Sequence, residues 1–130
     1  MTKEEKDLLL QDLCARLPYG VKISVQSWDE EEQEYVDKVD VLYSVNRDGY
    51  VKSANEDYDF DVEDIKPYLL PLSSMTEEQK KELQSLMVQE VYGILYHTIE
   101  SYGWLNKNHF DYRGLIPMEL AIDATGLNIY

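Results

Sequence analysis

The hydrophobic positions at the start of the chain follow the spacing of a helix. They fall on one helical face, at Leu9, Leu10, Leu13, Cys14 and Leu17. Thr2 and Glu5 have the spacing of a capping box ahead of this stripe, and Pro18 cannot continue the helical hydrogen bonds. We therefore expect a helix that ends before Pro18, with Cys14 on its buried face as a structural thiol.

The middle of the chain changes to alternating apolar and polar residues, which is the pattern of half-buried strands. Residues 21–28, 35–45 and 50–54 are predicted to be strands, and the last two form a hairpin around the turn at 46–49. In residues 57–65, aromatic and valine side chains alternate with acids, which indicates a fourth strand or a sheet edge whose acids face water.

The second half of the chain returns to helical spacing. Residues 66–75 contain two prolines and are expected to form an extended connector. Thr76 and Gln79 repeat the capping-box pattern, and the apolar stripe that follows predicts one long helix, which Gly103 ends. Residues 104–124 are predicted to form a helical turn, a loop and a last helix or strand.

These elements predict the α+β fold class in a single domain that spans residues 1–130. The expected arrangement begins with an N-terminal helix and a four-stranded, mostly antiparallel sheet, either open or curled into a small barrel. A long helix and a C-terminal helix-loop are expected to pack on this sheet.

The charge of the chain is strongly acidic and unevenly distributed. The formal net charge is −14, and residues 29–66 alone hold 14 acidic and 4 basic residues. Such a surface repels phosphate groups, whereas nucleic-acid binding depends on contacts from Lys and Arg to phosphates. Nucleic acid and anionic membranes are therefore not expected as partners, and a basic protein is favoured. The sequence does not define the oligomeric state.

Three features predict a cytoplasmic location. The N-terminal residues, MTKEEKDLLLQDLC, are acidic where a secretory signal would be basic, and no apolar run approaches the length of a membrane span. Cys14 is the only cysteine, so an intrachain disulfide cannot form, as is usual for proteins of a reducing compartment.

Tyrosine is the most distinctive residue of the composition. The chain has 11 tyrosines but only 2 phenylalanines and 2 tryptophans, and tyrosine is enriched at protein interfaces. Together with the acidic segment, this predicts a non-catalytic interaction module whose acidic, tyrosine-rich surface lies in residues 29–64. The residues expected to bind are Asp29, Glu30, Glu31, Glu32, Asp57, Asp59, Asp61 and, on the polar face of the long helix, Tyr96.

Two alternative functions are also compatible with the sequence. Carboxylates of the acidic segment could imitate phosphates, so that the chain would inhibit a DNA-binding protein as a nucleic-acid mimic. A metal-dependent hydrolase would instead use His97, Glu100, His109 and Asp111, which are residue types that ligate transition metals. The chain contains no HExxH, GxSxG or phosphate-binding glycine motif, so an enzyme has no positive support and no cofactor is expected.

The stretch WLNKNHFDYRGLI, residues 104–116, concentrates polar and aromatic side chains and is interpreted mainly as structure. Its apolar residues are predicted to anchor the C-terminal segment onto the long helix: Trp104, Leu105, Phe110, Leu115 and Ile116. Asp111 and Arg113 are close enough to pair across a turn or to cap nearby backbone groups.

Three segments resemble one family of small proteins: residues 4–25, residues 65–83 (IKPYLLPLSSMTEEQKKEL) and residues 104–116. This family occurs in gut Bacteroides genomes and in their phages and mobile elements, and it carries no assigned activity. The resemblance therefore implies a biological context and not a mechanism. The sequence departs from the family pattern at Leu70, where the family carries Arg, and at Glu119, where it carries Gly.

Overall fold

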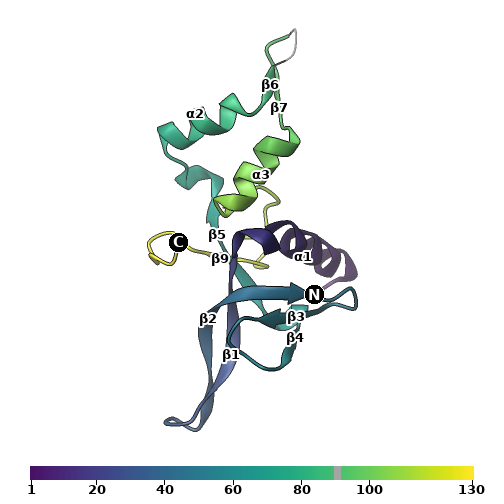
Figure 1. Ribbon diagram of the computed structural model, residues 1–130, viewed down its shortest axis with the longest axis vertical. Helices are drawn as coiled ribbons and strands as arrows, with labels where there is room; N and C mark the ends of the chain where they lie inside the picture. The colour runs from purple at the N-terminus through teal and green to yellow at the C-terminus, as the bar shows by residue number, and fades with distance from the viewer. Residues whose placement is uncertain (90–91) are drawn as a thin grey trace.

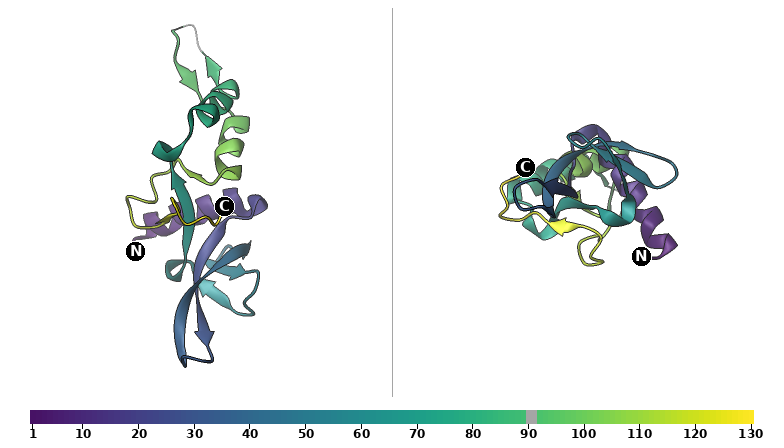
Figure 2. Two further views of the ribbon diagram at one scale, coloured as in Figure 1. Left: turned by 90° about the vertical axis from the view of Figure 1, so that its left-hand side faces the viewer. Right: turned by 90° about the horizontal axis from the view of Figure 1, so that it is seen from below.

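The computed structural model describes residues 1–89 and 92–130. The molecule is elongated, with the main sheet at one end, two helices at the other and the N-terminal helix between them (Figures 1 and 2). The described helices are α1 (Lys3–Arg16), α2 (Glu77–Ser85) and α3 (Ile99–Lys107). The main sheet contains β1 (Lys22–Asp29), β2 (Glu34–Val45), β3 (Tyr50–Ser53), β4 (Asp59–Asp61), β5 (Lys66–Pro71), β8 (Phe110–Asp111) and β9 (Ile122–Asp123). A separate hairpin is formed by β6 (Val88–Gln89) and β7 (Leu95–Tyr96).

The predicted α+β fold class is confirmed, but the prediction of four strands is wrong. The described sheet has seven strands in the order β4-β3-β2-β1-β5-β8, with β9 also paired to β5, and it does not close into a barrel. Strands β1 to β5 pair antiparallel, whereas β8 and β9 run parallel to β5. The extra strands arise because the expected connector forms β5, which then pairs with two short strands from the C-terminal segment.

The first helix forms as its caps predict, and Leu9 and Leu13 are buried as expected, but the rest of its buried face differs from the prediction. Thr2 Oγ1 accepts a hydrogen bond from the N–H of Glu5 at 3.1 Å, which completes the capping box. The face that packs on the sheet consists of Leu9, Asp12, Leu13 and Arg16. Cys14 lies off this face and is exposed, so the prediction of a buried thiol is wrong. The buried face includes the charged residues Asp12 and Arg16, so the spacing of hydrophobic residues alone did not identify it.

The predicted long helix is also wrong, because the described chain is helical only on either side of a β-hairpin. Helix α2 ends at Ser85, and β6 and β7 then pair antiparallel. Gly93 between them has φ +80°, a left-handed conformation that glycine adopts without strain. Residues 90 and 91, which the prediction also covered, lie outside the described residues.

A capping box that was not predicted starts α3. Thr98 Oγ1 accepts from the N–H of Ser101 at 3.1 Å, and the N–H of Thr98 donates to Ser101 Oγ at 2.7 Å. Thr98 therefore begins a new helix instead of continuing the apolar stripe of an old one. Gly103, which was expected to end the long helix, lies inside α3.

The buried side chains form two clusters. The larger lies between α1 and the main sheet and includes Leu9, Leu13, Val21, Ile23, Val25, Leu42, Phe60, Leu69 and Leu115. The smaller lies between α2, α3 and β8 and consists of Met75, Leu83, Trp104, Leu105 and Phe110. Residues 104–116 thus contribute apolar anchors to both clusters, as predicted, but they do not pack onto one long helix, because that helix does not form. Among the described helices, none combines the length and the apolar composition that crossing a membrane requires.

Candidate functional site

The acidic turn that joins β1 to β2 forms the free end of a projecting hairpin (Figure 1). Asp29 holds this turn, because its Oδ1 accepts from the N–H of Glu31 at 2.9 Å and from the N–H of Glu32 at 3.3 Å. The side chains of Glu30, Glu31 and Glu32 are exposed. Asp29 therefore orders the loop, and the three glutamates supply its solvent-facing negative charge.

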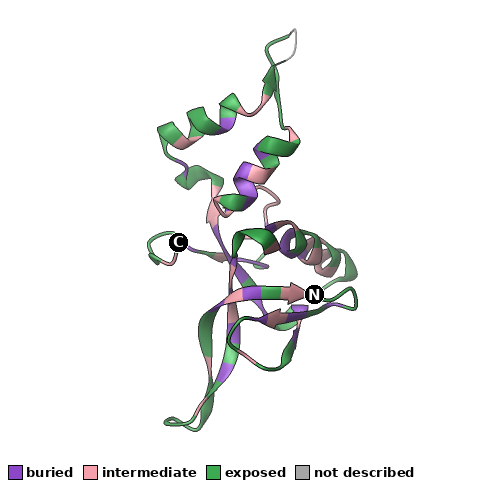
Figure 3. Ribbon diagram, in the orientation of Figure 1, coloured by how far each residue is buried: buried purple, intermediate pink, exposed green. Residues whose placement is uncertain are grey.

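An aromatic pair lies directly behind this turn. The antiparallel register places Trp28 opposite Tyr35, and their rings meet edge to face with centroids 5.1 Å apart. Both rings remain accessible, with 44% of Trp28 and 63% of Tyr35 exposed. Figure 3 shows that exposed residues dominate this part of the hairpin. Rings held rigidly at the surface lose little entropy on binding a partner.

A side-chain hydrogen bond from Tyr58, the residue before β4, links β4 to β1. The hydroxyl of Tyr58 donates to the carbonyl oxygen of Gln26 at 2.9 Å. Partial burial, and then the negative charge of Glu56 and the neighbouring Tyr35, raise the pKa of Tyr58. The phenol therefore stays neutral and can keep donating to Gln26, which brings the acids of β4 next to the aromatic hairpin.

A recess of about 320 Å³ opens where these elements meet. Its walls include the two tyrosines Tyr35 and Tyr58 and the three carboxylates Asp59, Asp61 and Asp64. The carboxylate of Asp61 already has partners within the protein. Its Oδ1 accepts from the N–H of Glu63 at 3.0 Å and lies 3.9 Å from Lys6 Nζ. Asp59 and Asp64 are exposed and make no ion pair with a described residue. We call this recess, together with Trp28 and the three glutamates of the turn, the acidic aromatic surface.

The recess has the chemistry of a receptor for a positively charged side chain. Aromatic faces attract ammonium and guanidinium groups through their quadrupole, and carboxylates add hydrogen bonds and charge. Among the walls named here, none carries a positive charge that would compete with such a group. The described residues of this surface do not include a nucleophile paired with a base, so the arrangement is suited to binding.

The structure separates the predicted interaction residues into three groups. Glu30, Glu31 and Glu32 lie at the hairpin turn, and Asp57, Asp59 and Asp61 lie in or next to β4. Tyr96 lies on β7, at the opposite end of the molecule (Figures 1 and 2). Its placement on a polar helix face was wrong, because the long helix does not form.

Several residues of this surface were not singled out from the sequence: Gln26, Trp28, Tyr35, Tyr58 and Asp64. One signal was available for Trp28 and Tyr35, since they flank a short acidic turn and lie opposite each other in the register that the hairpin adopts. The approach of Tyr58 to Gln26 joins residues 32 positions apart and has no local signal in the sequence.

The four residues of the metal-dependent alternative do not form a metal site. His97 Nδ1 lies 3.0 Å from Ser101 Oγ, whereas the His109 ring stacks on Tyr130 with centroids 3.7 Å apart. Glu100 is exposed on α3. Within the described ranges, no group of three or more His, Cys, Asp or Glu side chains could hold a metal ion.

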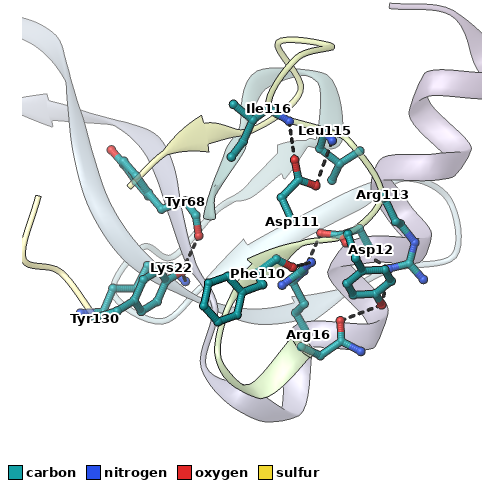
Figure 4. A network of polar contacts seen from close by, with 12 residues as sticks. Asp12, Arg16, Lys22, Tyr68, Phe110, Asp111, Arg113, Leu115, Ile116 and Tyr130 are labelled. Atoms are coloured by element: carbon teal, nitrogen blue, oxygen red, sulfur yellow. Dashed lines mark hydrogen bonds and ion pairs between the residues drawn. The ribbon is translucent and has the colours of Figure 1, made fainter. Parts of the chain in front are cut away.

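The remaining polar residues of 104–116 form a structural network around α1 (Figure 4). The two carboxylate oxygens of Asp111 accept from the N–H groups of Leu115 and Ile116, each at 2.9 Å, which confirms the predicted cap. Arg113 pairs with Asp12 at 3.1 Å and not with Asp111.

Asp12 and Arg16, which were not predicted as functional or structural polar residues, form the buried centre of this network. They are fully buried and pair at 2.9 Å, and Arg16 Nη2 donates to the carbonyl oxygen of Phe110 at 2.6 Å. Arg16 Nε pairs with Asp12 and Nη2 with Phe110, so this centre joins α1 to β8, whereas Nη1 is buried without an acceptor among the described residues. No family model, curated protein or solved structure matches the chain.

Proposed function

We propose that this chain is a non-catalytic interaction module that binds a basic protein partner through the acidic aromatic surface. The observation that carries the proposal is the recess in which Tyr35 and Tyr58 lie beside Asp59 and Asp64. A lysine or arginine side chain of the partner would enter this recess, and the exposed glutamates of the hairpin turn would contact further basic groups around it.

The energetics favour a partner with several basic groups. One exposed ion pair contributes only about 0.2–1 kcal/mol, and salt weakens it. A cation over an exposed aromatic ring adds about 0.5–1 kcal/mol. Specific binding therefore needs the recess and the glutamates to act together. The same charge accelerates association with a basic partner and disfavours acidic ones.

The proposal includes an origin in phages or mobile elements. Its support is the resemblance of residues 4–25, 65–83 and 104–116 to small proteins of gut Bacteroides and their phages. These segments contain α1, the strand β5, the start of α2 and the anchor stretch, all of which build the frame. The hairpin turn and β4 lie outside them, so a constant frame would present a variable surface to a host protein.

A pull-down from a Bacteroides lysate tests this function. The purified chain should retain a basic protein at low salt and release it at high salt. Tyr35→Ala removes an aromatic wall of the recess and should reduce retention, whereas Tyr92→Ala removes the exposed ring of a tyrosine at the opposite hairpin and should not. Retention that is insensitive to salt, or equal loss with both variants, would refute the proposal.

Competition with duplex DNA adds a second readout to the same experiment. If DNA displaces the chain from the retained partner, the partner uses its nucleic-acid site for this interaction, as mimicry requires. If DNA has no effect, the acidic aromatic surface recognises a basic protein without imitating nucleic acid.

A further inference from the structure

A second, chemically different cleft lies between α1 and the turn that joins β2 to β3, at the edge of the larger core. It has a volume of about 610 Å³ and is lined by Leu10, Cys14, Val45, Arg47 and Arg113, with polar contributions from neighbouring residues. The turn lies close to α1. A Cβ atom added to Gly49 would lie only 2.9 Å from Lys6 Cε. The volume is in the range of small-molecule sites, about 300–1,000 Å³.

The charge of this cleft opposes that of the whole molecule. Two arginines line it and no carboxylate does, although the chain has 26 acidic and 12 basic residues. Arg47 forms no ion pair with any described residue. A negatively charged ligand would thus meet two positive groups locally, on a protein that elsewhere repels it.

Arg113 is already held in place for such a ligand. Its Nη1 donates to Asp12 Oδ1 at 3.1 Å and to the hydroxyl of Tyr112 at 2.7 Å, and its guanidinium lies 4.7 Å from the Tyr112 ring centre. Asp12 is shared with Arg16, so it does not neutralise Arg113 alone. Neither Nε nor Nη2 of Arg113 donates to an acceptor in the described chain, which leaves donors free.

The rest of the lining defines the body of the ligand. Leu10 and Val45 are partly buried side chains at the edge of the larger core, so they present an apolar wall. Guanidinium groups recognise planar carboxylates through paired N–H donors. An apolar wall beside two arginines therefore matches a molecule with a hydrocarbon body and a carboxylate head.

We propose that this cleft binds an organic carboxylate with an apolar body, such as a medium-chain fatty acid. The site is separate from the acidic aromatic surface, and neither proposal depends on the other. Cys14, the only cysteine of the chain, lines the cleft and is exposed, so its accessibility reports whether the cleft is occupied.

The test measures the rate at which iodoacetamide alkylates Cys14 in the full chain, followed by mass spectrometry, with octanoate as the ligand. At an octanoate concentration about ten times its Kd, alkylation should slow about tenfold, because only unoccupied protein reacts. Arg47→Gln should raise Kd about tenfold through loss of a charge-assisted contact, so protection at that concentration falls to about twofold. Arg47 is exposed and outside the buried network, so this variant should fold normally.

Matched controls decide whether the head group is recognised. Lys81→Gln removes an exposed positive charge on α2 and should leave protection intact. Octanol has the same hydrocarbon body without the charge and should protect little. Equal protection by octanol, no protection by octanoate, or tighter binding of octyl phosphate than of octanoate would each overturn the assignment.

Discussion

Arg16 Nη2 donates a hydrogen bond of 2.6 Å to the carbonyl oxygen of Phe110, a residue 94 positions further along the chain. Arg16 belongs to α1, which packs on the larger core, and Phe110 belongs to the smaller core beside α2 and α3. This bond therefore ties the two hydrophobic clusters together. Asp12 supports it by pairing with Arg16 at 2.9 Å, with neither side chain exposed (Figure 4).

Arg16→Met should reduce the free energy of unfolding by about 3 kcal/mol, the low end of the usual cost of breaking a buried ion pair, because Asp12 keeps its contact with Arg113. Urea denaturation followed by circular dichroism measures this loss. The double variant Asp12→Leu with Arg16→Met removes both charges and should be less destabilised than Arg16→Met alone. A double variant that is less stable than the single one would show that the pair itself stabilises the fold.

Asp111→Ala should lower the free energy of unfolding by about 2–4 kcal/mol, because the buried N–H of Leu115 and the partly buried N–H of Ile116 lose their charged acceptor. Asp111→Asn keeps an oxygen for one of these groups and should lose about half as much. Thermal and urea unfolding of both variants measure the difference. Unchanged stability in Asp111→Ala would mean that water replaces the carboxylate without cost.

Stability should fall as the pH drops from about 6.5 to about 4 because of His109. Burial, then the positive charges of Arg16 and Lys22, lower the pKa of His109 from 6.5 to about 4. Between these pH values His109 binds a proton in the unfolded chain but not in the folded chain, so acid favours unfolding. The stabilising contribution is complete above pH 6.5 and is lost as the pH falls to about 4. The lowered pKa corresponds to about 3.4 kcal/mol, which solvent screening of the partly exposed ring reduces to about 2 kcal/mol.

Urea unfolding at several pH values checks this effect. His109→Gln should flatten the slope between pH 4 and 6.5, whereas His97→Gln, at an exposed histidine, should keep it. If His109→Gln retains the full slope, the pH dependence arises from carboxylates elsewhere in the protein.

Glu119→Gly should stabilise the protein by about 0.5–1 kcal/mol. Glu119 has φ +61°, a left-handed conformation that strains residues with a side chain by about 1–2 kcal/mol, and glycine recovers most of this despite its own entropic cost. Glu119→Ala removes the charge but keeps the strain, so it should show no comparable gain in melting temperature.

Local signals in the sequence predicted the local structure well. The Thr2 capping box, the alternation in 21–54 and the Asp111 cap all act within a few residues, and the structure contains them. The prediction of a long helix was wrong because it relied on the apolar stripe and overlooked two short signals, the turn at Gly93 and the cap at Thr98. Strand β5 was not predicted because its partners β8 and β9 lie some forty to fifty residues away in the sequence and leave no periodic pattern.

The acidic character of the candidate site was predictable, but the role of each acid was not. The sequence shows that the acidic residues concentrate in the middle of the chain, but it does not show which carboxylates accept hydrogen bonds within the protein. Asp40 is buried and accepts from the backbone N–H of Val41 and from Asn55, while Asp29 and Asp61 hold local turns. Glu30 and Asp59 face solvent, a distinction that depends on contacts formed only in the folded chain.

The most direct test of binding through the acidic aromatic surface compares two variants with the same change in net charge. Asp59→Asn with Asp64→Asn removes two exposed carboxylates from the recess, and Glu78→Gln with Glu82→Gln removes two exposed ones from α2. Calorimetric titration with the partner retained in the pull-down should give a Kd about tenfold weaker for the first variant and less than about twofold weaker for the second. Equal weakening by both variants would show that net charge alone drives binding and would contradict a specific surface.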